Sequence, residues 1–73
     1  MQITCDNFES SNITKFTYDT TDSVLYVTFK NGATYKYLDV SIGEFVIFMK
    51  SESVGKALNS QIKPFKKYEQ VGV

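Results

Sequence analysis

The clearest pattern in the chain is an alternation of apolar and polar side chains over residues 23–29. An extended segment with this period places three large apolar side chains on one face, Leu25, Val27 and Phe29. Asn31-Gly32, a dipeptide typical of hairpin turns, follows at once and leads into Tyr35-Lys36-Tyr37. We therefore predict a β-hairpin whose second strand carries both tyrosines.

Two registers are open to this hairpin. A two-residue turn on Asn31-Gly32 pairs Lys30 with Ala33 and directs both tyrosines away from the apolar face. A turn with Gly32 in a left-handed bulge position pairs Phe29 with Ala33 instead, and directs the tyrosines toward the apolar face. Since a slip of one residue moves every side chain to the opposite face, we predict the bulged register, which gathers the large apolar groups together.

The other extended segments predict a small antiparallel sheet. Residues 1–9 show no clear period and predict an irregular N-terminal arm or a short edge strand. Residues 12–18 predict a strand with a bulge, because the step from Ile13 to Phe16 is odd. A fourth, C-terminal strand fits the alternation over residues 65–71.

Two amphipathic helices are predicted between these strands. Ser41 and Glu44 have the spacing of a capping box and predict a helix over 42–50. Its run Phe45–Met49 is apolar throughout and cannot all face one sheet, so part of it must pack on the second helix, contact another subunit or stay exposed. We interpret this run as the best sign of a homo-oligomer. A second helix is expected from Ser53 to Pro64. Its apolar side holds Val54, Ala57, Leu58, Gln61 and Ile62, and its polar side holds Lys56, Asn59, Ser60 and Lys63. The fold class is α+β, with residues 1–73 forming one domain.

The charge composition of the chain argues against one class of function, general binding of duplex DNA. Eight basic and eight acidic residues give zero net charge, which argues against a general binder of duplex DNA. Residues 50–73 hold five lysines against two acids, so the C-terminal third is locally basic.

One cysteine and no histidine exclude an internal disulfide and a zinc cluster. The chain has no apolar run of about 18 residues and no signal-like start, so we expect no membrane association and a cytoplasmic location.

The catalytic machinery of common enzyme classes is not evident. The usual general base, histidine, is missing, and Cys5 has no basic neighbour in the sequence to lower its pKa. Gly55-Lys56 lacks the upstream glycine of a phosphate-binding loop. Asp19, Asp22 and Asp39 fit turn positions. We expect a protein that is not an enzyme and needs neither metal nor other cofactor.

Several motifs resemble the KTSC family. They are Ser11-Asn12-Ile13, Tyr18-Asp19, Leu25-x-Val27-x-Phe29-x-x-Gly32-x-x-Tyr35-x-Tyr37 and Ser53-x-Gly55-Lys56-x-x-Asn59-x-x-Ile62-Lys63. Ser41 stands where the family has proline before its first helix, and Leu58 stands where it has an aromatic residue. The resemblance implies a small domain, named for a C-terminal extension of some lysyl-tRNA synthetases and also found as single-domain bacterial and phage proteins. It implies binding of RNA or nucleotides, with no catalytic mechanism.

The start of the second helix is the first candidate binding site. Its free N–H groups, with Ser53, Gly55 and Lys56, suit a phosphate. Further along the same helix, Asn59 and Ser60 can form hydrogen bonds with the edge of a base or ribose, and Lys63 adds a positive charge. Stacking on a base can come from Tyr35, Tyr37 and Tyr68. The alternatives are an ordinary solvated helix face and tyrosine rings that pack in the core.

Three functions remain open on these grounds. The first is a phage-type oligomeric sponge that sequesters a nucleotide, such as a cyclic dinucleotide immune signal of the bacterial host. The second is an RNA-binding accessory domain that uses lysines 56, 63, 66 and 67. The third is a protein–protein interaction or inhibitor protein that uses the exposed part of Phe45–Met49.

Overall fold

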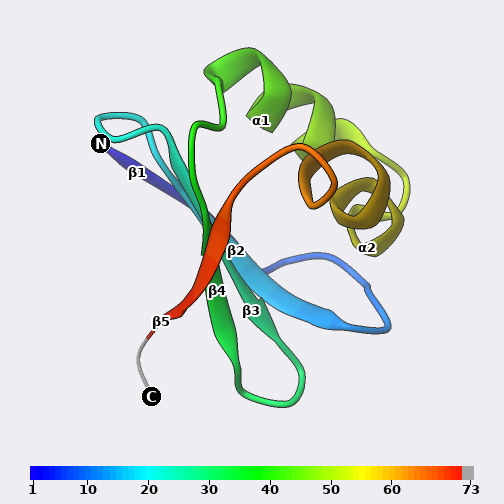
Figure 1. Ribbon diagram of the computed structural model, residues 1–73. Coiled ribbons are helices and arrows are strands. Elements are labelled where there is room, and N and C mark those ends of the chain that lie inside the picture. Colours follow the sequence, from blue (N-terminus) through cyan, green and yellow to red (C-terminus); the bar gives the residue numbers. More distant parts are fainter. Residues whose placement is uncertain (72–73) are drawn as a thin grey trace.

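A five-stranded antiparallel sheet carries the fold, with both helical segments on one of its faces (Figure 1). The computed structural model describes residues 1–71. The strands are β1 (Gln2–Cys5), β2 (Ile13–Asp19), β3 (Val24–Phe29), β4 (Thr34–Tyr37) and β5 (Tyr68–Val71). They lie in the sheet in chain order, β1-β2-β3-β4-β5. The predicted α+β class is confirmed, and the sheet has more strands than the three or four expected.

The central hairpin adopts the bulged register. Leu25 pairs with Tyr37 and Val27 pairs with Tyr35, as predicted. Gly32 has φ 92°, a left-handed conformation that glycine adopts without steric cost, and its N–H donates to the Phe29 carbonyl at 2.9 Å. The turn thereby directs both tyrosines to the face that carries the helices.

The N-terminal segment is extended rather than irregular over its first residues. Strand β1 pairs antiparallel with β2, Ile3 opposite Tyr18 and Cys5 opposite Phe16. The irregular arm predicted for residues 1–9 is therefore wrong for 2–5, and the alternative of a short edge strand is confirmed. Its short length and mixed burial leave little periodic signal in the sequence. The predicted bulge in the next strand is present between Ile13 and Lys15.

Helix α1 (Ile42–Lys50) has the predicted bounds and the predicted cap. The Glu44 N–H donates to Ser41 Oγ at 3.1 Å, and Glu44 Oε1 accepts from the Ser41 N–H at 3.0 Å. These reciprocal bonds satisfy N–H groups that the first turn leaves without partners. Ser41, which replaces the family proline, therefore has a structural role of its own at this position.

The second helix differs from the single regular helix predicted up to Pro64. It consists of α2 (Val54–Ala57) followed by a π-helical turn, η1 (Leu58–Ile62), in which the Lys63 N–H donates to the Leu58 carbonyl at 2.8 Å. The wider turn changes which side chains face the sheet. Gln61, which a regular period places on the apolar side, is exposed, whereas Leu58 and Ile62 are buried.

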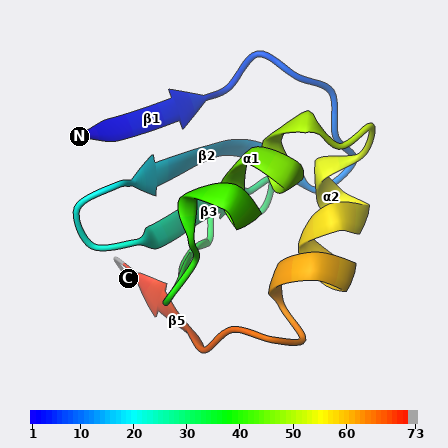
Figure 2. The same cartoon turned by 90° about the horizontal axis from the view of Figure 1, so that it is seen from above.

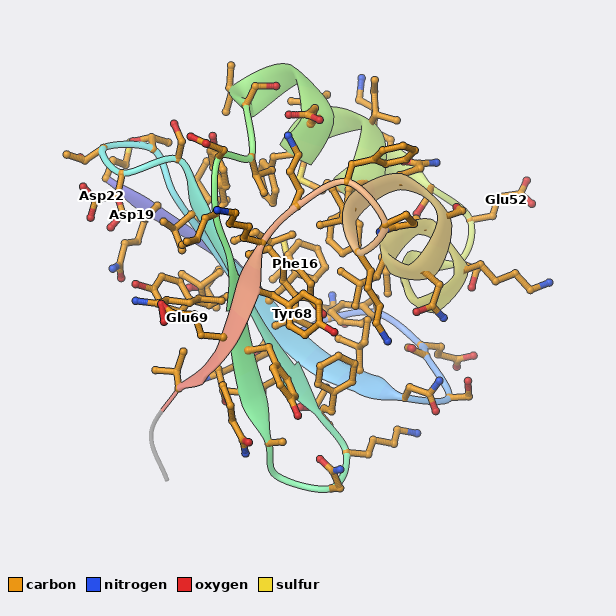
Figure 3. All side chains as sticks on the ribbon, in the orientation of Figure 1. Phe16, Asp19, Asp22, Glu52, Tyr68 and Glu69 are labelled. Carbon is orange, nitrogen blue, oxygen red and sulfur yellow. The ribbon has the colours of Figure 1, made fainter. Side chains whose placement is uncertain are left out.

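An aromatic cluster joins the helices to the sheet, and Figure 3 labels its member Phe16 between them. The Phe16 ring of β2 meets Phe48 edge-on with centroids 4.9 Å apart, and the Tyr18 ring stacks on Phe45 with centroids 4.5 Å apart. Phe45 and Phe48 are fully buried, so neither can contact a partner as the sequence suggested. The expectation that part of the apolar run stays exposed is confirmed by Ile47, which is 62% exposed, and by Met49.

A buried hydrogen bond fixes the segment that leads into α1. The Tyr18 hydroxyl donates to the Val40 carbonyl at 2.6 Å, and the Val40 N–H donates to the Ser23 carbonyl at 2.9 Å. Ser23 and Asp39 both have φ 57°, a left-handed conformation that is uncommon outside glycine. The β2–β3 turn and the β4–α1 connection are thus joined at one end of the sheet, where Asp19 and Asp22 also lie (Figure 3).

A single lysine ties the last connection to α1. Lys66 Nζ donates to Glu44 Oε1 at 2.8 Å and to the Asp39 carbonyl at 2.7 Å. The hydrogen bond from Lys66, followed in size by that from the Ser41 N–H, lowers the pKa of Glu44 below its ordinary value of 4.5. The Glu44 carboxylate therefore stabilises the folded state, not only the helix start.

We expect the stability of the protein to fall in acid partly because of Glu44. A lowered folded-state pKa means that this contribution is complete above the unfolded value of 4.5 and is lost as the pH falls through the folded-state pKa. Urea unfolding across this pH range should show a smaller acid loss for Glu44→Gln than for the wild type. Glu52→Gln, which changes an exposed acid, is the control and should follow the wild type. Parallel curves for Glu44→Gln and the wild type would contradict the assignment.

Candidate functional site

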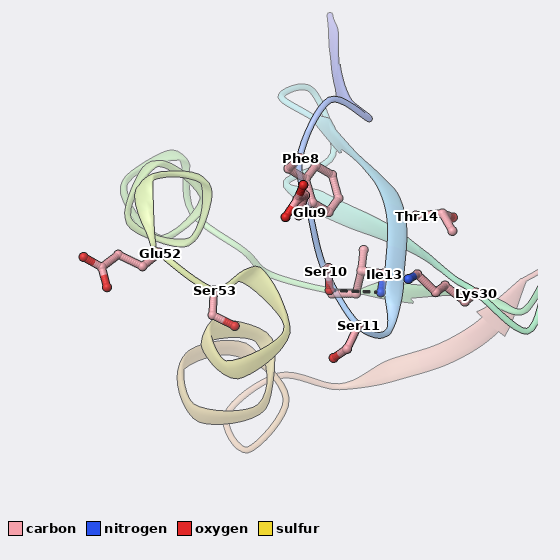
Figure 4. A pocket seen from close by; sticks show the side chains of 9 residues that line it. All are labelled: Phe8, Glu9, Ser10, Ser11, Ile13, Thr14, Lys30, Glu52 and Ser53. Carbon is pink, nitrogen blue, oxygen red and sulfur yellow. Dashed lines mark hydrogen bonds between the residues drawn. The ribbon is translucent and has the colours of Figure 1, made fainter.

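The connection between β1 and β2 and the start of α2 enclose a cleft of about 690 Å³ (Figure 4). We call it the loop–helix cleft. Its walls combine hydroxyl, charged and apolar side chains from Phe8, Glu9, Ser10, Ser11, Ile13, Thr14, Lys30, Glu52 and Ser53. Two segments far apart in the sequence, residues 8–14 and residues 52–53, therefore face the same space.

Ser10 organises the loop side of this cleft. Its Oγ accepts hydrogen bonds from the N–H groups of Asn12 at 3.3 Å and Ile13 at 3.2 Å, which turns the chain into β2. A Cβ placed on Gly55 would lie 3.6 Å from the same oxygen. The loop and the start of α2 are therefore close, and Ile13 anchors the loop because its side chain is buried in the core.

The charges of the loop–helix cleft are mixed. Lys30 is the cation, and Glu9 and Glu52 are the acids. Figure 4 shows the Glu52 side chain directed away from the loop, whereas Ser53 lies at the start of α2. The hydroxyl groups can donate and accept hydrogen bonds, so the cleft suits a polar ligand with few charges better than a highly charged polyanion.

A second cleft of about 410 Å³ adjoins the first through Lys30. We call it the aromatic cleft, since Phe29 and Tyr35 line it together with Asn12, Lys30 and Asn31. The two rings meet edge-on with centroids 5.7 Å apart, and both side chains are half-buried. Rings held in this way can stack on a flat ligand, while the amide side chains can bind its polar edge.

The profile of the KTSC domain matches residues 9–68, most of the chain. The chain belongs to the KTSC family. A protein of Tsukamurella paurometabola is 38% identical over 56 residues, which cover 77% of this chain and 84% of that protein. The crystal structure of a KTSC domain protein from Yersinia pestis has a TM-score of 0.87 and 27% identity, covering 99% of this chain and all of that one. The family that the motifs resembled is thereby confirmed.

This KTSC domain brings only some of the predicted site residues to the two clefts. Ser53 lines the loop–helix cleft and Tyr35 lines the aromatic cleft. Ser60 lines a different groove, between Ile47 of α1 and Phe65. The other polar residues of this helical segment, Lys56, Asn59 and Lys63, are exposed on the surface of α2 and η1, as the polar stripe predicted.

The predicted phosphate site at the helix start is already partly occupied by the protein itself. Ser53 Oγ accepts from the Lys56 N–H at 3.4 Å, so the cap uses a donor that an anion would need. The Ser60 hydroxyl donates to the Lys56 carbonyl at 2.9 Å. The segment also has only four α-helical residues before its π turn, which leaves a weak dipole.

The three predicted tyrosines have different exposures. Tyr37 is 2% exposed, and burial raises its pKa. The bulged register places its ring in the core, as the alternative interpretation held, so the ring offers no open surface on which a base can stack. Tyr68 is exposed and its ring lies against Tyr35 and Tyr37, with centroids 6.0 and 5.4 Å apart. Tyr35 is thus the member of the group that lines a described cleft.

Several cleft residues were not singled out from the sequence as binding residues. They are Ser10, Ser11, Asn12, Thr14, Phe29, Lys30 and Asn31. The polar run Ser10-Ser11-Asn12 is a sequence signal for a binding loop, because it directly precedes the partly buried strand β2 and includes part of the family motif. Lys30 and Asn31 were interpreted only as turn residues.

The lysines proposed for RNA are not equally available. Lys66 is bound to Glu44 and to the Asp39 carbonyl, and its side chain is only 14% exposed. Another lysine, Lys36, forms an ion pair with Glu69 at 3.3 Å. Lys56, Lys63 and Lys67 are exposed. This distribution reduces the positive surface that a nucleic-acid backbone requires.

Two further observations concern the described part of the chain. Over residues 1–71, no helix has the length and apolar character needed to cross a bilayer. In the same residues, no three acidic, cysteine or histidine side chains are grouped so that they can hold a metal ion. The groups that line the two clefts can form hydrogen bonds, offer one lysine charge and the carboxylates of Glu9 and Glu52, and present aromatic rings for stacking.

Proposed function

We propose that this KTSC domain binds a nucleotide without transforming it, across the loop–helix cleft and the aromatic cleft. The observation that carries the proposal is the adjacency of the two clefts, which share Lys30. A nucleotide needs an aromatic surface for its base and hydroxyl groups with a cation for its sugar and phosphate. Both sets of groups are available side by side.

The base is assigned to the aromatic cleft. Phe29 and Tyr35 offer ring surface, and stacking on such a surface contributes roughly 1–3 kcal/mol per base. Asn12 and Asn31 can donate to and accept from a base edge. Asn31 Oδ1 already accepts from the Ala33 N–H at 2.9 Å, which orients this amide. Its NH₂ group is the end that can reach a ligand.

The sugar and phosphate are assigned to the loop–helix cleft. Lys30 stands where the two clefts meet and supplies the positive charge. Ser11 and Ser53 supply hydroxyls from opposite walls. Glu9 limits the negative charge that the cleft tolerates, which favours a ligand with one or two phosphate charges over RNA.

The physiological role we propose is sequestration of a cyclic dinucleotide signal by a phage-type sponge. Zero net charge, a localised cation and hydroxyl-lined walls suit a ligand whose ring closure leaves each phosphate with a single charge. A sequestering protein needs tight binding and intact release, and it needs no catalytic base. The full sequence contains no histidine, the residue most often used for that purpose.

A nucleotide panel that includes cyclic dinucleotides is expected to contain a ligand that raises the melting temperature, because a ligand in excess stabilises the folded state. Tyr35→Leu should weaken binding of that ligand roughly tenfold or more by removing ring surface. Lys30→Ala should weaken it by a similar factor and reduce the dependence of affinity on salt. Isothermal titration calorimetry measures both effects.

Matched controls separate the two clefts from the predicted site residues that lie outside them, Tyr68 at the start of β5 and Lys56 on the second helix. Tyr68→Leu and Lys56→Ala make the same chemical changes outside the two clefts and should bind like the wild type. Stronger losses in these controls than in Tyr35→Leu and Lys30→Ala would overturn the assigned site in favour of the surface around Tyr68 and Lys56. Recovery of chemically altered ligand after heat denaturation would overturn the non-catalytic role.

A further inference from the structure

Strand β1 forms an open edge of the sheet (Figures 1 and 2). The hydrogen bonds between β1 and β2 show which of its backbone groups lack a partner in the sheet. The Thr20 N–H donates to the Met1 carbonyl at 2.9 Å, which makes Met1 and Thr20 a hydrogen-bonded pair. In an antiparallel ladder such pairs alternate, so Ile3 and Cys5 also direct their backbone groups toward β2. The N–H and C=O groups of Gln2 and Thr4 therefore point outward, away from the sheet.

This edge lacks the features that usually protect an exposed strand. Residues 1–5 contain no lysine, no acid and no proline, and β1 has no bulge against β2. The opposite edge strand, β5, carries Glu69 within the strand, and Lys67 directly precedes it. A free edge strand without charged side chains is a template for another strand, so β1 is the edge suited to pairing.

We propose that β1 pairs antiparallel with β1 of a second copy of this chain, around a two-fold axis at Ile3. Such a contact is isologous, since the same strand serves both partners. With the axis at Ile3, Gln2 stands opposite Thr4 of the second copy, and Thr4 stands opposite its Gln2. These are the residues with outward N–H and C=O groups, so each of the two pairs exchanges two backbone hydrogen bonds. The two sheets then form one continuous ten-stranded sheet.

The side chains of β1 match themselves in this register. Ile3 opposes Ile3 of the second copy, and Met1 opposes its Cys5, all on the face that carries the helices. Ile3 and Cys5 are only partly buried within one copy, and both pack against its core. On the other face Gln2 opposes Thr4, whose hydroxyl is 2.9 Å from that of Thr17. Apolar groups thus meet apolar groups, and polar groups meet polar groups. This self-complementarity is the reason for assigning the edge to a second copy rather than to a different peptide.

The proposal is independent of the nucleotide site and names a different surface from the exposed residues of α1. Pairing of the two β1 strands would also bury more of the Ile3 and Cys5 side chains, which extends a small hydrophobic core. Edge pairing of two four-residue strands buries a modest area, so the association is expected to be weak and concentration-dependent.

Disulfide trapping tests the register. In a Cys5→Ser background, Ile3→Cys places two thiols directly opposite each other in a pair without backbone hydrogen bonds, where the Cα atoms are close enough for a disulfide. Thr4→Cys in the same background is the matched control, because its partner in the second copy is Gln2. Mild oxidation should give a covalent dimer of the Ile3→Cys protein much faster than of the Thr4→Cys protein. Equal rates, or faster cross-linking of Thr4→Cys, would overturn the register.

A proline variant tests the pairing itself without relying on cysteine. Thr4→Pro removes an outward N–H and leaves the bonds between β1 and β2, so it should be a folded monomer with wild-type secondary structure. Thr4→Val loses only the hydroxyl contact and should dimerise like the wild type. Light scattering and circular dichroism measure both properties. A wild type that stays monomeric up to about 1 mM, or a folded Thr4→Pro protein that still dimerises, would overturn the proposal.

Discussion

Phe48→Ala is expected to leave most of the chain unfolded at 25 °C. The side chain is fully buried and meets Phe16 edge-on at 4.9 Å. Removing a buried phenylalanine costs about 3–5 kcal/mol, because apolar contacts are lost and a cavity remains. A core of this size supplies about the same net stability, so the loss removes most of the free energy of unfolding. Far-ultraviolet circular dichroism and urea titration measure the outcome.

Ile47→Ala is the matched control, because it changes the neighbouring position of the same helix. Ile47 is 62% exposed, so its loss removes little buried surface, and alanine favours the helix. The expected change in unfolding free energy is within about 0.5 kcal/mol. If Phe48→Ala remained as stable as Ile47→Ala, the packing of α1 on the sheet described here would be incorrect.

Tyr18→Phe is expected to lower the melting temperature by roughly 5–20 °C. The substitution keeps the ring that stacks on Phe45 and removes only the hydroxyl that donates to the Val40 carbonyl at 2.6 Å. That carbonyl is buried, and leaving it without a partner costs about 1–3 kcal/mol, which corresponds to such a shift in a domain of this length. Calorimetry measures the change.

The control for Tyr18→Phe removes a hydroxyl from an exposed ring. Tyr68→Phe should leave the melting temperature almost unchanged, because water solvates the Tyr68 side chain. A shift for Tyr18→Phe no larger than that for Tyr68→Phe would show that the buried hydrogen bond does not hold the β4–α1 connection in place.

The parts of the fold that follow from local chemistry were predictable. The bulged hairpin follows from Gly32 and the need to keep Leu25 and Val27 on the same face as the tyrosines. The first helix follows from Ser41 and Glu44, whose reciprocal hydrogen bonds are local. In each case residues close in the sequence determine the conformation, so tertiary contacts were not needed to choose between the alternatives.

The parts that depend on tertiary packing were not predictable in the same way. Strand β1 has only four residues and gains its conformation from pairing with β2. The π turn after Ala57 adds a residue to the helical repeat, which keeps Leu58 and Ile62 on the core side but turns Gln61 out of it, so a 3.6-residue period misplaces Gln61. Neither feature leaves a strong periodic signal.

The candidate site shows the same division. Ser53 was found because it begins a helix, and Tyr35 because it belongs to a distinctive motif. The sequence does not indicate Lys30 as a binding residue, because its role in binding depends on two clefts that meet at its side chain. Tyr37 belongs to the same Tyr35-Lys36-Tyr37 motif, but its ring is buried in the core. A residue type indicates what a site can bind, but only the packing of separate segments shows where that site lies.

The connections between the strands differ in length, so the loop-closure entropy lost on folding differs from one connection to the next. The connections from β2 to β3 and from β3 to β4 span residues 20–23 and 30–33, whereas the connection from β4 to β5 spans residues 38–67. Loop-closure entropy grows by about 0.6 kcal/mol for each doubling of length, so closing the last connection costs about 2 kcal/mol more than closing either short one. That same connection contains α1, α2 and η1, whose burial of Phe45 and Phe48 offsets the cost. The longest loop of the fold is therefore also the segment that builds its core.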